Sequence, residues 1–142
     1  MSRSTVAAFF AVPVLFAGCG GSSDTASHEP AVVEEVAGTD LSRITLTPEA
    51  AERLDIKTGN VERSGGATLI PYSAVFYSPT GETWTYTNPE GLTFVRQRIA
   101  VDSIDGARAR LSKGPEPGTK VATVGVAELY GTESGLGADS GH

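Results

Sequence analysis

The chain has 142 residues and a formal net charge of −6, a size that allows one domain with flanking segments and excludes two. Seventeen glycines and eight prolines favour an all-β fold with frequent turns over a helical bundle. Residues 20–40 contain five acidic and no basic residues, whereas residues 41–131 contain ten of each. The acidity therefore precedes the expected domain, and the chain lacks the basic stripe of a nucleic-acid-binding protein, so we expect no nucleic-acid partner.

Residues 1–18 have the pattern of an export signal. Arg3 supplies a positive start, residues 6–16 form an apolar run interrupted only by Pro13, and Ala17 and Gly18 are the small residues that a signal peptidase requires. The apolar run is about half of the roughly 20 residues that a helix needs to cross a bilayer. We therefore favour a cleaved signal peptide over a permanent transmembrane span.

Cys19 is the only cysteine of the chain, so no internal disulfide is possible. Ala17-Gly18-Cys19 resembles the lipobox of bacterial lipoproteins, although Phe16 stands where leucine is usual. The resemblance implies cleavage between Gly18 and Cys19 and diacylation of the Cys19 thiol. The alternative is an ordinary secretory signal with a cysteine nearby. Each buried methylene contributes about 0.8 kcal/mol, so two acyl chains would hold the protein on the extracytoplasmic face of the cell membrane.

This interpretation of the N-terminus divides the chain into four expected segments. Residues 1–18 are the signal peptide, and residues 19–40 are the lipid anchor and an acidic, flexible tether with little periodicity. Residues 41–131 form the β domain. Residues 132–142 are rich in glycine and serine and are predicted to be a disordered tail.

The first elements of the domain have clear local signals. Residues 43–46 alternate as a short strand does. Thr47 offers an N-cap oxygen, Pro48 suits the first helical position and Glu49 complements the helix dipole. These signals predict a two-turn helix over residues 48–54, followed by an extended segment over 56–62.

Short extended segments then follow one another up to residue 129. They are separated by turn signals at 64–66, 79–81, 88–91, 105–106 and 114–118. Trp84 and Tyr86 alternate with threonines, which indicates a strand with one buried face. We predict an all-β fold with one short helix, a small β-roll or barrel of six or seven strands.

Few residues of the expected domain could support catalysis. The only histidines, His28 and His142, lie outside it, so we expect no metal site, no Ser-His or Cys-His nucleophile and no cofactor. A hydrolase would need a pair of acidic residues. The candidates for such a pair lie in or beside turns, where acids are usually solvated; they are Glu82, Glu90, Asp102 and Asp105.

Two groups of residues could either bind a ligand or partner or have a purely structural role. Trp84 and Tyr86 could line a ligand groove, or they could be core residues. The arginine pairs in the second half of the chain could share one face of neighbouring strands, either as a docking patch for a partner or as a solvated face. These pairs are Arg96 with Arg98, and Arg108 with Arg110.

Several segments have the patterns of a known domain. Residues 69–75 have a hydrophobic residue, a proline, one further residue and then Ser-Ala-Val, and residues 81–86 have a glycine, three further residues and then Thr-Tyr. Residues 94–101 have the pattern of an arginine-containing strand, and residues 113–121 contain a Gly-Pro turn. With residues 44–61, these segments resemble the membrane-proximal domain of periplasmic adaptor (membrane fusion) proteins, which serve RND-type efflux pumps and related transporters. Pro115 and Thr119 depart from the family, which favours leucine and aspartate there.

The resemblance covers residues 44–129 and implies a truncated form. Adaptors also carry a lipoyl-like domain, a helical hairpin and a separate barrel, whose place near residues 64–67 is taken here by a few residues. The resemblance implies a non-catalytic lipoprotein that associates with an efflux permease, of the RND or ABC type, at the outer face of the cytoplasmic membrane. The alternative is a cell-envelope lipoprotein that binds a small ligand or an envelope component. The oligomeric state is left open by the sequence.

Overall fold

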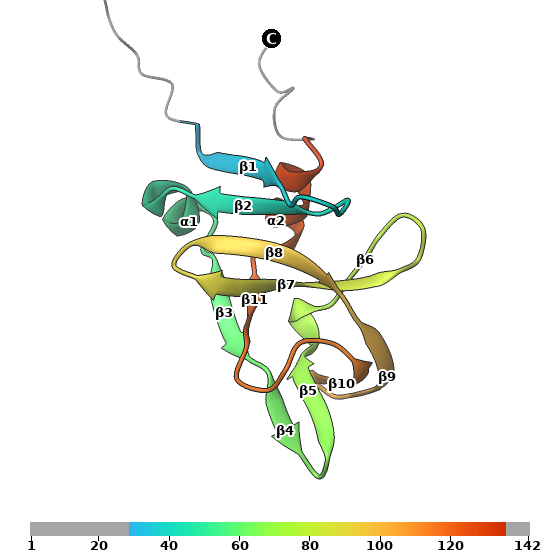
Figure 1. Cartoon of the computed structure of the whole chain (residues 1–142). Helices are drawn as coiled ribbons and strands as arrows, with labels where there is room; N and C mark the ends of the chain where they lie inside the picture. Colours follow the sequence, from blue (N-terminus) through green and yellow to red (C-terminus); the bar gives the residue numbers. More distant parts are fainter. Residues whose placement is uncertain (1–28, 136–142) are drawn as a thin grey trace, which may run out of the picture.

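The computed structural model describes residues 29–135, which fold mainly into two antiparallel β-sheets (Figure 1). Sheet A contains, in spatial order, β1 (Ala31–Glu35), β2 (Ser42–Leu46), β8 (Thr93–Arg98), β7 (Thr83–Glu90), β11 (Lys120–Val124) and β3 (Lys57–Asn60), with β6 (Phe76–Tyr77) pairing β7. Sheet B contains β4 (Glu62–Ser64), β5 (Ala67–Pro71), β10 (Arg108–Lys113) and β9 (Ala100–Asp105). The predicted all-β class is confirmed, but the sheets do not close into a barrel and the strands outnumber the expected six or seven.

The short helix α1 (Pro48–Arg53) forms where its capping residues predict it. The Thr47 side chain accepts a hydrogen bond from the Ala50 N–H at 3.2 Å, and Pro48 occupies the first turn. Glu49 lies at the positive end of the helix and Arg53 at the negative end. Local chemistry therefore accounts for where this helix begins, and the burial of Ala50 holds it on the domain.

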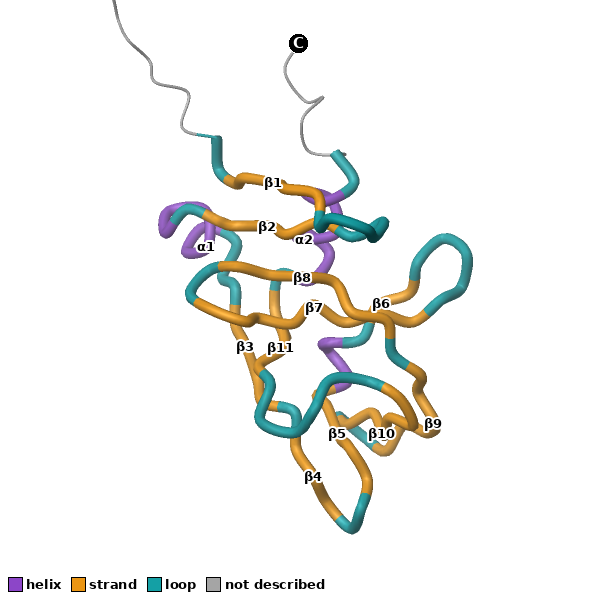
Figure 2. The backbone as a smooth tube through the Cα atoms, viewed as in Figure 1, coloured by secondary structure: helices purple, strands orange, loops and turns teal. Residues whose placement is uncertain are grey.

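One continuous extended segment contributes a strand to each of the two sheets. Residues 94–101, expected as one arginine-containing strand, divide at the buried Ile99 into β8 of sheet A and β9 of sheet B. The Ile99 N–H donates to the Thr83 carbonyl, which holds the crossover against β7. Figure 2 shows the chain passing from one sheet to the other at this point.

The interior has two apolar clusters rather than one. The first lies where sheet A packs against its helices and includes Ile44, Phe94 and Leu129. The second is contributed by both sheets and includes Ile70, Leu111 and Val121. The chain alternates between the two clusters along its length, so neither half of the sequence forms a core by itself.

Both ends of the domain differ from the sequence expectation. Residues 31–35, assigned to the flexible tether, form β1, in which every residue pairs with β2. The expected extended segment 120–129 ends at Val124, and residues 126–133 form a second helix, α2 (Val126–Glu133), which enters the expected tail. β1 forms because β2 offers it a full set of backbone partners, and α2 forms because Val126 and Leu129 can be buried against sheet A.

Candidate functional site

The predicted lipid anchor lies outside the described residues, as do Gly18, Cys19 and both histidines. The described chain begins at Glu29, next to the edge strand β1. β1 lies at one end of the molecule, and the hairpin of β4 and β5 lies at the opposite end (Figure 1). Within residues 29–135, no helix is both long and apolar enough to cross a membrane.

A buried polar cluster joins α2 to sheet A. The Tyr86 hydroxyl donates a hydrogen bond of 2.5 Å to Glu133 Oε2. Arg96 Nε lies 3.3 Å from Glu133 Oε1, an ion pair rather than an aligned hydrogen bond. The Ser42 N–H reaches the same carboxylate oxygen at 3.4 Å. The Glu133 side chain is only 6% exposed, so a carboxylate in the last turn of α2 is held by three different strands.

Aromatic side chains surround this cluster. The Arg96 guanidinium lies 4.5 Å from the centre of the Trp84 ring, a cation–π arrangement. Phe76 stacks on Tyr86 with ring centroids 5.1 Å apart. Burial, and then the hydrogen bond to Glu133, raise the pKa of Tyr86 far above its usual value, so this phenol stays protonated.

Tyr86 is therefore part of the interior, whereas Trp84 is only half-buried. Tyr86 is fully buried, and Trp84 lies beneath Arg96 on the same face of sheet A. Sequence reasoning missed Glu133 because it fell in the expected tail. The signal was present in the apolar spacing of Val126, Leu129 and Tyr130, a helical pattern that brings Glu133 to the same side.

The arginine pairs do not share a face of neighbouring strands, which corrects the sequence expectation. Arg96 and Arg98 belong to β8 of sheet A, whereas Arg108 and Arg110 belong to β10 of sheet B. The expectation failed because β9 leaves sheet A and carries β10 with it. Arg96 is mostly buried, and Arg98 pairs with Glu82 at 2.7 Å.

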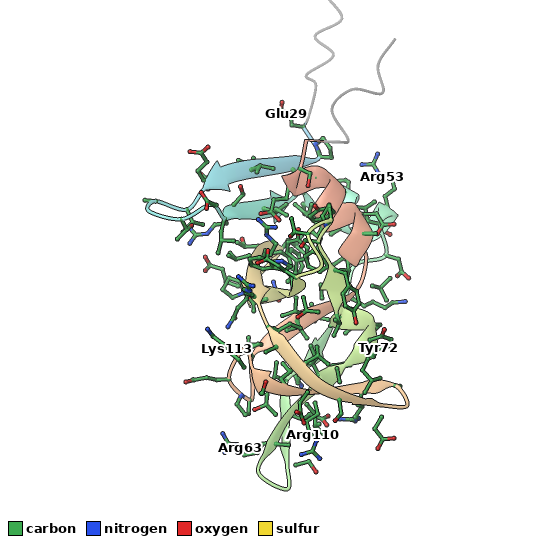
Figure 3. The ribbon with its side chains drawn as sticks, turned by 90° about the vertical axis from the view of Figure 1, so that its right-hand side faces the viewer. Glu29, Arg53, Arg63, Tyr72, Arg110 and Lys113 are labelled. Carbon is green, nitrogen blue, oxygen red and sulfur yellow. The ribbon has the colours of Figure 1, made fainter. Side chains whose placement is uncertain are left out.

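The outer face of sheet B carries the second arginine pair. Opposite residues on adjacent strands place Glu62, Leu69, Arg110 and Ser103 in one row across the sheet. Arg108 lies on the same face and forms an ion pair with Glu62. Arg110 is exposed and takes part in none of the ion pairs found among residues 29–135. Figure 3 shows Arg110 and Arg63 at the end of the molecule opposite Glu29.

The acidic residues considered for a hydrolase are dispersed. Glu82 pairs with Arg98, Glu90 ends β7, and Asp102 and Asp105 lie exposed on β9. In the part of the chain that the structure describes, no three His, Cys, Asp or Glu side chains gather as metal ligands would.

An apolar cleft of about 430 Å³ opens beside the beginning of β1. It lies between α1 and the last turn of α2, and its lining includes Pro30, Ala31, Leu46, Ala50, Leu54 and Gly131. The cleft offers apolar contact and few hydrogen-bonding groups.

Comparisons of the chain with protein-family models, with curated proteins and with solved structures find no match.

Proposed function

We propose that this chain is a lipid-anchored, non-catalytic, adaptor-like protein that associates with an efflux transporter at the outer face of the cytoplasmic membrane. Two sequence features support the proposal. The first is the lipobox-like Ala17-Gly18-Cys19, and the second is the resemblance of residues 44–129 to an adaptor membrane-proximal domain. The β-rich architecture is compatible with that resemblance.

The observation that carries the proposal is the placement of the two ends of the domain. Cys19 and Glu29 are ten residues apart, so at most about 36 Å of chain separates an acylated Cys19 from the domain. Glu29 precedes β1, at the end of the molecule opposite the β4–β5 hairpin (Figure 1). An anchor at Cys19 would therefore hold the β1 end near the bilayer and leave sheet B free to meet a neighbouring membrane protein.

The outer face of sheet B carries one pair of residues that could serve at a contact surface. An exposed arginine, Arg110, stands directly opposite the partly exposed Leu69. Arginine is enriched at protein interfaces because its planar head forms several hydrogen bonds while its stem covers apolar surface. We infer that Arg110 and Leu69 lie at the contact with the transporter.

Photo-crosslinking in living cells tests this assignment. A photoreactive amino acid at Arg110 is expected to capture a transport protein, whereas the same group at Glu34, exposed on β1, is expected not to. Capture of no transport protein from either position would refute the adaptor function. Capture from Glu34 alone would refute the assignment of the contact to sheet B.

A further inference from the structure

The two sheets have four end strands, and three of these have features that discourage pairing with another chain. β3 contains Lys57 and Gly59, and its pairing with β11 has a shift in register. β4 is only three residues long. β9 has two shifts in register along β10. Short strands, edge lysines and bulges are devices by which natural proteins prevent edge-to-edge association.

β1, the fourth end strand, has none of these features. All of its residues pair with β2 without a shift in register, and it contains no lysine, glycine or proline. Val32 and Val33 are 51% and 43% exposed, and as neighbours in a strand they point to opposite faces of the sheet. Figure 1 shows no strand on the outer side of β1. This edge is therefore both regular and apolar.

The hydrogen bonds that flank β1 determine which of its backbone groups point outward. The Thr47 N–H donates to the Pro30 carbonyl, and the Val36 N–H donates to the Leu41 carbonyl. In an antiparallel pair, residues whose backbone groups face the neighbouring strand alternate with residues whose groups face away. The even-numbered residues of β1 therefore face β2, and the odd-numbered residues direct their N–H and C=O groups to the free edge. The outward-facing residues are Ala31, Val33 and Glu35.

This spacing is self-complementary in an antiparallel pair. If Val33 of one copy lies opposite Val33 of another, Ala31 lies opposite Glu35, so every outward-facing residue meets another outward-facing residue. Each such pair can exchange two backbone hydrogen bonds. Glu34 then lies opposite Val32, so within the strand no carboxylate stands directly opposite another.

The acidic residues of this segment disfavour the neighbouring registers. A shift of the second copy by two residues in one direction would place Glu34 opposite Glu34. A shift in the other direction would place Glu35 opposite Glu29. Like charges directly opposite each other on neighbouring strands are destabilising. Of these three registers, only the one centred on Val33 combines complete backbone pairing of β1 with separated carboxylates.

We propose that β1 pairs with β1 of a second copy of this chain, antiparallel and centred on Val33. The two copies of sheet A then form one continuous sheet. Pairing satisfies the outward backbone groups of β1 and covers the exposed Val33 side chains with one another. The contact involves no transporter, so its test is independent of the adaptor function proposed above.

Disulfide trapping tests the pairing in the full chain carrying Cys19→Ser, in which an introduced cysteine is the only one. Opposite residues of a hydrogen-bonded pair have Cα atoms about 5.5 Å apart, a separation that a disulfide spans. Val33→Cys is therefore expected to give covalent dimers under mild oxidation. The matched control is Ile104→Cys on β9, a position of similar exposure, 47% against 43%, which is expected to stay monomeric. Equal yields of dimer from the two variants, or no dimer from Val33→Cys, would overturn the proposal.

A pair of charge substitutions tests the register by sedimentation equilibrium of the same Cys19→Ser chain. Val32→Lys places a cation opposite Glu34 of the second copy, whereas Val32→Glu places a carboxylate there. The dimer Kd is expected to be about tenfold lower for Val32→Lys than for Val32→Glu, because two symmetry-related pairs each change from repulsion to attraction.

The matched controls carry the same two substitutions at Val124, which is 39% exposed on β11. These variants change the net charge equally but lie outside the contact, so their Kd values are expected to be the same. Equal Kd values for the two Val32 variants would overturn the proposal, and so would a difference of the same size at Val124.

Discussion

Replacement of Glu133 by alanine is expected to destabilise the domain by about 2–4 kcal/mol. The Glu133 carboxylate accepts a hydrogen bond from the Tyr86 hydroxyl and lies beside Arg96. A hydrogen bond to a charged group contributes about 1.5–3 kcal/mol. Its loss also leaves the Arg96 guanidinium without a counter-charge. Because the Arg96 side chain keeps 18% of its exposure, water offsets part of that cost, and the expected range therefore lies about 1 kcal/mol lower than the 3–5 kcal/mol typical of a fully buried broken pair.

Urea unfolding followed by fluorescence measures this change directly. Trp84 is the only tryptophan, and Arg96 lies against its ring, so its emission reports on the cluster itself. The matched control is Glu128→Ala, which removes an exposed carboxylate from the same helix and is expected to change stability by no more than about 0.5 kcal/mol.

A double-mutant cycle isolates the contact between Tyr86 and Glu133. If the hydrogen bond stabilises the fold, Glu133→Ala and Tyr86→Phe should be coupled by at least about 1 kcal/mol, since each removes the same bond. A loss below about 1 kcal/mol for Glu133→Ala, or strictly additive effects of the two substitutions, would refute the reasoning.

Three other predictions concern pH, backbone conformation and the anchor. Because the pKa of Tyr86 is raised in the folded state, the contribution of its protonated phenol to stability is complete below pH 10 and is lost as the pH rises further. Above pH 10 the unfolding free energy of the parent should therefore fall more steeply than that of Tyr86→Phe, by up to about 1.4 kcal/mol per pH unit. Equal slopes of unfolding free energy against pH, measured by urea titration, would contradict this. Gly125 has φ of +82°, and a Cβ there would lie 2.1 Å from Ile56 Cδ1, the tip of a side chain that must shift. Gly125→Ala should therefore cost more than Gly106→Ala, by up to about 1 kcal/mol, because φ is also positive at Gly106 but its surroundings are open. Equal urea midpoints would rule out the clash. Cys19→Ser should release the protein from the membrane fraction, and mass spectrometry should find acyl chains on the parent alone; an unmodified thiol in the parent would disprove the anchor.

Local chemistry determined those parts of the fold whose causes lie within a few residues. Thr47 and Pro48 mark where α1 begins, because the cap and the fixed φ act on the first helical turn. The alternation around Trp84 and Tyr86 likewise predicts a strand with one buried face, and β7 forms there. In each case the signal and its effect are adjacent in the chain.

The identity of each strand's partner was decided by the tertiary structure. The acidic segment 31–35 becomes β1 only because the edge of β2 offers it backbone groups to pair with. Arg108 and Arg110 leave the neighbourhood of Arg96 only because the chain crosses between sheets at Ile99. Such choices depend on apolar burial and hydrogen bonding between segments far apart in sequence, and no local pattern encodes them.

The candidate functional residues likewise include some that the sequence alone predicts and some that depend on the tertiary structure. The lipobox-like pattern that ends at Cys19 consists of three consecutive residues, so the sequence alone predicts the anchor. Glu133 is different, because an acid in a polar stretch acquires a role only when α2 brings it against Tyr86 and Arg96, 47 and 37 positions earlier in the chain. Its partners are set by the packing of a helix on a sheet, a free-energy balance to which every buried residue of the first cluster contributes.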